Sequence, residues 1–257
     1  GDASRYINAG GGNVLALRIR GGSVFGRNVA GATAFIPPQE RLYAGGPTTV
    51  RGFSQNELGS LIYISRPKYE QFLSTDLLGR PDTVVLQPTT ADSSFGARVR
   101  RVVPVGGNAL FVGNLELRLR SPVLPELLQF TIFTDAGEVW NRGTPQVSSG
   151  VKLKVTPGIQ FTAFSPVGPV RLAVGYNPYQ RPKGPIYYEA TELADAPLLC
   201  VSPLNNIPTH FEYDPNDPTR ITNITQNTAI CPATYQPPKD NSFRSKLTFS
   251  FAIGQAF

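Results

Sequence analysis

The sequence predicts an all-β protein, and within that class a transmembrane antiparallel β-barrel with long extracellular loops. Three observations predict it. The chain ends in a strand-like alternation, in which Phe249, Phe251, Ile253 and the terminal Phe257 are separated by small or polar residues such as Gly254. No stretch approaches the roughly 20 apolar residues that a membrane helix needs. The alternating segments are joined by connections that are short and long in turn, as in outer-membrane barrels.

Alternation alone also suits a soluble two-layer sheet. The terminal aromatic residue favours the membrane, because the closing strand of an outer-membrane barrel places such a residue at the water–lipid boundary. The composition agrees with this. Only 16% of residues are charged and the mean hydropathy is −0.13, which suits a barrel whose lipid-facing residues are hidden by alternation. The 25 Gly and 24 Pro residues favour strands and irregular loops over helices.

The net charge of +6 and the pI near 9.4 do not by themselves indicate nucleic-acid binding. The densest basic cluster, Arg98–Arg101, is short and has no interleaved aromatic residues. Surfaces that bind single-stranded nucleic acid combine a basic stripe with aromatic side chains. We therefore expect no nucleic acid as a partner. Lipid phosphates, a solvated loop and the barrel lumen remain as alternatives for this cluster.

Six segments alternate in the manner of strands: 13–25, 109–120, 127–140, 151–164, 170–177 and 246–257. Segment 109–120 is the clearest. Its odd positions are apolar or Gly, whereas Asn114, Glu116, Arg118 and Arg120 occupy four consecutive even positions. A soluble core would not bury such a series without partners, but a water-filled lumen accepts it.

The connections predict the topology. Ser121–Glu126 and Ser165–Pro169 are tight Pro-containing turns, and residues 26–107 and 178–244 are long loops that we expect on the extracellular side. The last strand would then end on the periplasmic side. Within the first long loop, Ser60–Ser65 and Thr83–Gln87 are expected to form a hairpin. Six strands are fewer than the roughly eight of the smallest membrane barrels, and the first starts near residue 13, so residues 1–257 are expected to be the C-terminal part of a larger barrel.

A short segment in the first long loop points to a family. On local grounds Gly45–Phe53, with the sequence GGPTTVRGF, is a Gly/Pro turn that presents one arginine. It resembles the sixth extracellular loop of the bacterial outer-membrane protein assembly factor superfamily, the BamA/TamA-like proteins. In the same order, Gly113–Arg118 resembles the twelfth strand of that family, Phe133–Trp140 the thirteenth, Thr156–Tyr176 the fourteenth and fifteenth, and the last nine residues the sixteenth.

The resemblance implies a function and a location. It implies the C-terminal strands of a 16-stranded barrel in the bacterial outer membrane, which inserts and folds other outer-membrane proteins and is neither an enzyme nor dependent on a cofactor or metal. A translocation pore of the two-partner-secretion type and a structural barrel within a larger outer-membrane complex are the alternatives. The implied partners are outer-membrane lipids and lipopolysaccharide, client barrel proteins, and accessory lipoproteins or other complex subunits.

The resemblance also implies a site. The loop would fold back into the lumen, where Arg51 meets Glu116 and Asp135. Glu116 is inward by the alternation of its own strand, and Asp135 is inward if it shares a face with Gly137. A planar guanidinium can satisfy carboxylates in two directions. Around the arginine, Gly52 lets the backbone pass close to the wall and Phe53 anchors the turn that begins at Val50.

Two further expectations concern the last strand and the cysteines. Phe249, Phe251, Ile253 and Phe257 should face lipid, and the strand, with Gly254, would form one side of a seam at which the barrel opens. Cys200 and Cys231 share one polar loop and lack the spacing of a zinc site, so a disulfide is expected. His210 is the only histidine, which disfavours a metal centre.

Overall fold

The computed structural model describes residues 1–29, 32–65, 69–75, 81–88, 99–142, 152–166, 168–189, 198–200, 207–226 and 234–254. These residues form strands and loops, with single 3₁₀ turns at η1 (Pro38–Glu40) and η5 (Arg244–Lys246). No helix in this part of the chain has the length and apolar character needed to cross a membrane. The chain divides into two units, residues 1–60, 104–180 and 238–257 in the first, and 61–103 and 181–237 in the second.

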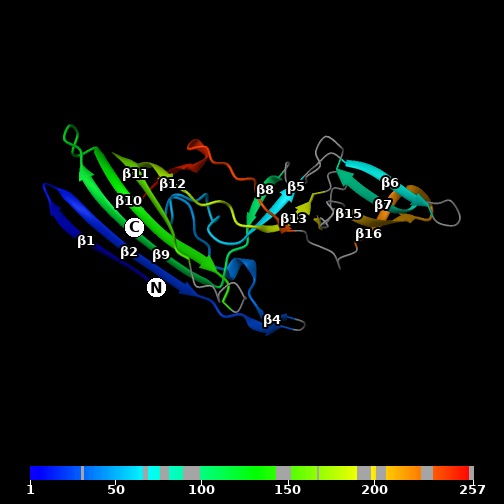
Figure 1. Cartoon of the computed structure of the whole chain (residues 1–257). Coiled ribbons are helices and arrows are strands. Elements are labelled where there is room, and N and C mark those ends of the chain that lie inside the picture. The colour runs from blue at the N-terminus through cyan, green and yellow to red at the C-terminus, as the bar shows by residue number, and fades with distance from the viewer. Residues whose placement is uncertain are drawn as a thin grey trace. The chain divides into compact units, whose positions relative to one another are not determined.

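The first unit is built on an antiparallel sheet of seven strands in the order β1-β2-β9-β10-β11-β12-β18 (Figure 1). Every neighbour in this order is antiparallel. The strands are β1 (Asp2–Gly10), β2 (Asn13–Ser23), β9 (Ala109–Arg120), β10 (Leu128–Trp140), β11 (Lys154–Ser165), β12 (Gly168–Tyr176) and β18 (Leu247–Ile253). A two-stranded ribbon, β3 (Arg27–Val29) and β4 (Ala32–Phe35), follows β2.

Five of the six predicted strands shift at one or both ends, and β9 has its predicted bounds. The expectation that no strand precedes residue 13 was wrong, because β1 pairs with β2 along nearly its whole length. Its sequence, DASRYINAG, carries Tyr6 and Ile7 on opposite faces, and every residue in it is exposed. A strand without an apolar face gives no alternation from which it could be predicted.

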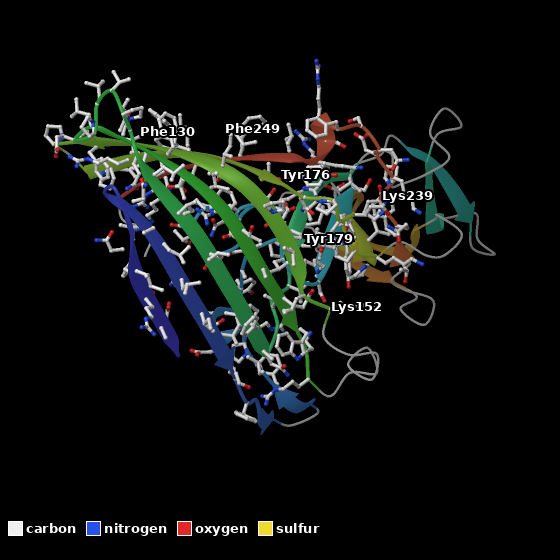
Figure 2. The ribbon with its side chains drawn as sticks, turned by 60° about the vertical axis from the view of Figure 1, so that its left-hand side comes forward. Phe130, Lys152, Tyr176, Tyr179, Lys239 and Phe249 are labelled. Carbon is white, nitrogen blue, oxygen red and sulfur yellow. The ribbon has the colours of Figure 1, made fainter. Side chains whose placement is uncertain are left out.

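The sheet has one polar and one apolar face, but the polar face is the buried one. Its buried members are Asn114, Glu116, Thr131, Asp135, Thr156, Gln160 and Thr162. The opposite, apolar face is exposed, with Phe130, Ile132, Ile159, Leu172 and Phe249 among its members. Phe130 and Phe249 are labelled in Figure 2. Apolar residues outside and polar residues inside are the arrangement of a strand wall between lipid and a lumen.

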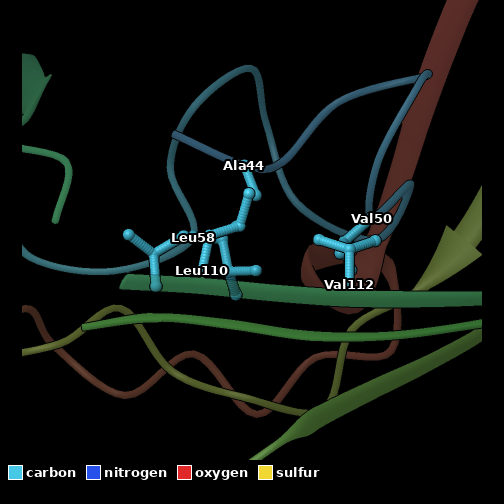
Figure 3. Close-up of a cluster of buried hydrophobic side chains, with 6 residues drawn as sticks. Ala44, Val50, Leu58, Leu110 and Val112 are labelled. Carbon is cyan, nitrogen blue, oxygen red and sulfur yellow. The ribbon is translucent and has the colours of Figure 1, made fainter. Parts of the chain in front are cut away.

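A loop covers part of the polar face. Between β4 and residue 60 the chain folds back, and Ala44, Val50 and Leu58 of this loop pack on Leu110 and Val112 of β9 (Figure 3). Val139 of β10 completes the cluster. Burying each such aliphatic side chain stabilises the fold by about 1.5–3 kcal/mol. The loop is therefore held on the wall by an apolar contact as well as by the polar one described below.

The second unit combines residues 61–103 and 181–237, which are parts of the two long loops. One sheet has the order β14-β13-β5-β8, with β17 on β13, and the other has the order β16-β15-β7-β6. The strands are β5 (Leu61–Ser65), β6 (Tyr69–Thr75), β7 (Pro81–Pro88), β8 (Val99–Pro104), β13 (Gly184–Tyr188), β14 (Leu199–Cys200), β15 (Ile207–Asp214), β16 (Asp217–Gln226) and β17 (Thr234–Tyr235). The predicted hairpin of Ser60–Ser65 with Thr83–Gln87 was wrong. In its place β5 pairs with β13, and β7 with β6 and β15, so each loop supplies strands to the other.

Candidate functional site

The polar face is ordered in rows that run across the strands. Residues that pair directly in neighbouring strands share a face, so the register defines each row. The first row contains Arg18, Asn114, Asp135 and Thr156. The second contains Ala16, Glu116, Phe133, Gly158, Gly175 and Thr248. The third contains Arg118, Thr131, Gln160, Ala173 and Ser250, and the fourth Arg120, Gln129, Thr162, Arg171 and Ala252.

Arg51 of the loop lies on the first two rows and meets both predicted acids. Its Nε donates to Asp135 Oδ2 at 2.8 Å and its Nη2 to Asp135 Oδ1 at 2.7 Å, a two-pronged pair. Its Nη1 lies 2.6 Å from Glu116 Oε1. The side chains of Arg51, Asp135 and Glu116 are only 2%, 0% and 1% exposed. Charges so well shielded from water are stable only when matched in this way.

Three further residues complete the Arg51 contacts. Gln160 Oε1 accepts from Arg51 Nη1 at 3.0 Å, and the ring of Phe133 lies 3.6 Å beneath the guanidinium carbon. Asn114 Nδ2 donates both to the backbone carbonyl of Thr49, at 2.6 Å, and to Asp135 Oδ1, at 2.8 Å. Sequence reasoning did not assign these roles. The inward parity of Asn114 and Gln160 was visible, but the row that brings them to Arg51 depends on strand register.

The backbone of the loop contacts the same acid. The amide of Arg51 donates to Asp135 Oδ2 at 2.9 Å, so Asp135 receives three hydrogen bonds from one residue. Within the turn, the amide of Phe53 donates to the Val50 carbonyl at 3.1 Å, and Gly46 donates to the Phe53 carbonyl at 2.9 Å. Gly46 has φ +98°, a conformation that favours glycine. These hydrogen bonds shape the turn, which presents the backbone amide and the guanidinium of Arg51 to Asp135 together.

Glycines in the wall make room for the loop. A Cβ on Gly175 of β12 would lie 2.9 Å from the Gly52 backbone, and one on Gly137 of β10 would lie 2.9 Å from Val50. Thr248 of β18 donates its hydroxyl to the Gly52 carbonyl at 2.8 Å. The loop tip thus lies directly against the wall, from β10 to the last strand, with no space for larger wall residues.

Phe53 holds the other side of the turn. Its ring stacks on Tyr179, with the centroids 6.4 Å apart, and Lys154 Nζ lies 5.8 Å from its centroid. Lys154 is also paired with Glu138 at 3.0 Å. The anchoring role that the resemblance implies for Phe53 therefore has physical partners at the start of β11 and beyond the end of β12.

A second set of contacts reaches the first two strands. Glu116 Oε2 lies 2.7 Å from Arg118 Nη2, and the Arg118 guanidinium is 5.5 Å from the ring centroid of Tyr6 on β1. Arg18 of β2 pairs with Asp2 of β1 and donates to the Thr48 carbonyl at 3.2 Å. Loop residues 48–52 are therefore bonded, directly or through one side chain, to both edge strands of the sheet.

The last strand has the predicted faces as far as it is described. Phe249, Phe251 and Ile253 are 75%, 57% and 62% exposed, and their neighbours Ser250 and Ala252 are half-buried on the polar face. Gly254 closes the strand with φ +96° and donates to the Pro169 carbonyl at 2.9 Å. Phe257 lies outside the described residues.

Cys200 pairs through its backbone with Tyr187 of β13, and Cys231 lies outside the described residues, so the disulfide stays a prediction. His210 belongs to β15. In the part of the chain that the structure describes, no group of three or more His, Cys, Asp or Glu is placed to hold a metal ion. The candidate site is thus a set of matched charges and hydrogen bonds that positions a loop.

Comparison with known proteins identifies the family. The model of the Omp85 superfamily domain matches residues 1–257. Among solved structures, the chain is similar to BamA from Haemophilus ducreyi lacking POTRA domains 1–3, with a TM-score of 0.42 and 19% sequence identity. That match covers 70% of this chain and 30% of the other, so the chain spans well under half the length of that protein. Since the family model matches the full length of the sequence, the chain belongs to the Omp85 superfamily and is a bacterial outer-membrane protein.

Proposed function

We propose that this chain is the part of an outer-membrane assembly factor that receives client β-barrel proteins and helps them to fold and insert. A client strand would pair with the open edge of β18 and extend the sheet by β-augmentation. The observation that carries the proposal is that β18, among the described residues, pairs with β12 alone. In the proposed mechanism its second edge presents backbone donors and acceptors that an incoming strand can satisfy.

The register indicates which groups an incoming strand would meet. The amide of Gly254 donates to Pro169 and the carbonyl of Lys246 accepts from Asn177, so the even-numbered residues of β18 direct their backbone groups to β12. In an antiparallel pair the hydrogen-bonding direction alternates along the strand. The amides of Phe249, Phe251 and Ile253 therefore point to the open edge.

Loop residues 48–52 give this edge its rigidity in the proposed mechanism. A templating strand must keep its register while a flexible client aligns with it, and the Thr248–Gly52 bond connects β18 to the buried Arg51. The exposed apolar face would contact outer-membrane lipids and lipopolysaccharide. Accessory lipoproteins or other subunits would complete the assembly, and neither a nucleotide nor a metal is needed, because strand pairing and burial in lipid supply the driving force.

A proline substitution tests the open edge. In proteoliposomes that contain the full-length protein, the folding rate of an unfolded client barrel is followed by heat-modifiable gel mobility. Phe251→Pro removes one open-edge donor and leaves the β12 hydrogen bonds in place, whereas Phe251→Ala removes the same ring and keeps the donor. We expect acceleration of client folding by the wild type and by Phe251→Ala, and a loss of several-fold for Phe251→Pro.

The two alternative functions, a translocation pore and a structural barrel, predict other results. A translocation pore would export a partner at the same rate in all three proteins without accelerating barrel folding, and a structural barrel would do neither. Equal acceleration by Phe251→Pro and Phe251→Ala would also exclude templating at this edge.

A further inference from the structure

We propose that Arg171 holds a carboxylate of the strand that pairs with the open edge of β18, so that the edge selects client strands with an acidic residue on their lumen-facing side. This inference rests on the proposed function, because it needs a strand at that edge. It adds a recognition element that backbone pairing alone does not provide.

Arg171 is a cation that has no hydrogen-bond or ion-pair partner among the residues that the structure describes. It lies on the fourth row of the polar face, between Thr162 of β11 and Ala252 of β18. Within the described part of the chain it makes no hydrogen bond or ion pair, in contrast to Arg18, Arg51, Arg118 and Arg120 on the same face. A half-buried guanidinium with five donors and no acceptor is poorly satisfied.

The local charge favours an anion. Arg171 lies within electrostatic reach of Arg118 and Arg51, which are also positive, and of Glu116. Glu116 is already shared by Arg51 and Arg118, and Asp135 is bound by Arg51. Three arginines therefore face two carboxylates that are both engaged. One further carboxylate would balance the cluster.

No large side chain of β18 separates Arg171 from the open edge. Ala252 is the residue of β18 directly opposite Arg171, and its side chain is a single methyl group. A strand added at the edge would place a residue opposite Ala252, two strand spacings or about 10 Å from Arg171. Arginine and glutamate side chains that extend toward each other over an alanine can span that distance.

Hydroxyl groups on the third and fourth rows add possible hydrogen-bond donors. Ser250 on β18 and Thr131 on β10 have buried side-chain oxygens that find no hydrogen-bond partner in the described part of the chain. Thr162 accepts a hydrogen bond from Gln160 at 3.2 Å, which leaves its own hydroxyl hydrogen free to donate. Thr162 and Ser250 therefore lie on the two strands that flank β12, close to Arg171 and to the short turn between β11 and β12, which we expect on the periplasmic side.

Peptide binding tests the inference. The probe is a fluorescent peptide with the sequence of residues 246–257 of this chain, KLTFSFAIGQAF, in which Ala252 is replaced by Glu or, as the matched control, by Gln. Binding to the full-length protein in detergent is measured by anisotropy. We expect the Glu peptide to bind about fivefold more tightly than the Gln peptide, the preference that a partly shielded ion pair provides.

Variants assign the preference to one residue. Arg171→Ala should abolish the preference for Glu, so that the two peptides bind equally, Arg171→Lys should keep part of the preference, and Arg171→Glu should reverse it. Arg120→Ala removes a cation from the same row, three strands away, and should keep the full preference. Folding of each variant is checked by heat-modifiable mobility.

The outcomes separate this inference from the proposed function. Equal binding of the two peptides to the wild type, or a preference that survives in Arg171→Ala, would overturn the role of Arg171 and leave edge templating standing. Failure of both peptides to bind the wild type would overturn edge templating and the role of Arg171 with it.

Discussion

Thr248, on the last strand, donates its side-chain hydroxyl to the backbone carbonyl of Gly52, at the tip of a loop 196 residues earlier in the chain, at 2.8 Å. The bond joins the strand at the open edge of the sheet to the residue that follows the buried Arg51. The loop tip is thereby bonded directly to the strand at which we propose that clients pair.

Removing this bond should loosen the loop without unfolding the sheet. Thr248→Val keeps the shape of the side chain and removes the donor, at a cost of about 1 kcal/mol. We expect faster hydrogen exchange at the amides of residues 50–53 and faster protease cleavage of the loop. Thr134→Val makes the same chemical change on the apolar face of β10 and should alter neither measurement. Identical exchange in the two variants would show that the Thr248 bond does not hold the loop.

Gly175→Ala should displace the loop by a clash. Its Cβ would lie 2.9 Å from both Cα and N of Gly52, which are backbone atoms and cannot rotate away. We expect a cost of about 1–3 kcal/mol, seen as a lower urea midpoint for loss of the folded gel band. Gly113→Ala on β9, where the nearest atom is 3.9 Å away, is the control. A midpoint unchanged from wild type in Gly175→Ala would contradict the close approach.

The strands with one apolar and one polar face could be predicted from the sequence, because alternation is the direct consequence of facing lipid and a lumen. The bounds of β9 are an example. Strand β1, exposed along its whole length, lacks that signal. In the second unit it is the pairing that could not be predicted, since β7 pairs with β15, more than 100 residues later, and no local pattern specifies so distant a partner.

Two features of the sequence predicted part of the candidate site: the alternation within each strand, which shows the face a residue occupies, and the family resemblance of the loop. The inward side of Glu116 follows from its own strand. The participation of Gln160 and Phe133 does not, because it depends on the register between β10 and β11, which sets Gln160 opposite Thr131 and next to the Phe133 row. That Arg171 pairs with none of the described acids could likewise not be predicted, because it depends on where the neighbouring acids lie.

The two faces of β18 should differ in their tolerance of charge. Ile253→Lys places an ammonium on the apolar face, which costs up to ~2–4 kcal/mol at mid-bilayer and less near the boundary. Ala252→Lys places the same group toward the lumen, where repulsion from Arg171 adds only about 0.2–1 kcal/mol. We expect a larger loss of heat-modifiable barrel in cells from Ile253→Lys. Equal yields of the two variants would contradict the assigned faces.

The cysteines should be oxidised in the exported protein. A Cys200–Cys231 bond closes a loop of about 30 residues and would stabilise the second unit by roughly 3–4 kcal/mol in the chain-entropy model. Mass spectrometry of a non-reduced digest should show one cross-linked peptide pair. Cys200→Ser and Cys231→Ser should accelerate proteolysis of residues 181–237 to the same degree. Two alkylatable thiols in the untreated protein would rule out the bond.

Arg51 is expected to be the residue whose loss affects the loop most. Arg51→Ala leaves the buried Asp135 without its counter-charge and leaves Glu116 paired with Arg118 alone, and removing one partner of a buried ion pair typically costs about 3–5 kcal/mol. The strands should still form, since their own ladders are intact, while the loop becomes protease-sensitive and client folding slows. Arg120→Ala removes an arginine that is about half exposed and should be nearly neutral.

Arg51→Lys distinguishes charge from geometry. An ammonium can reach one carboxylate but cannot present paired donors to Asp135 while a third nitrogen meets Glu116. We therefore expect partial recovery of protease resistance relative to Arg51→Ala, with client folding still below wild type. Full recovery by lysine would mean that positive charge alone suffices. No effect of Arg51→Ala on either measurement would show that the buried pair does not hold the loop on the wall.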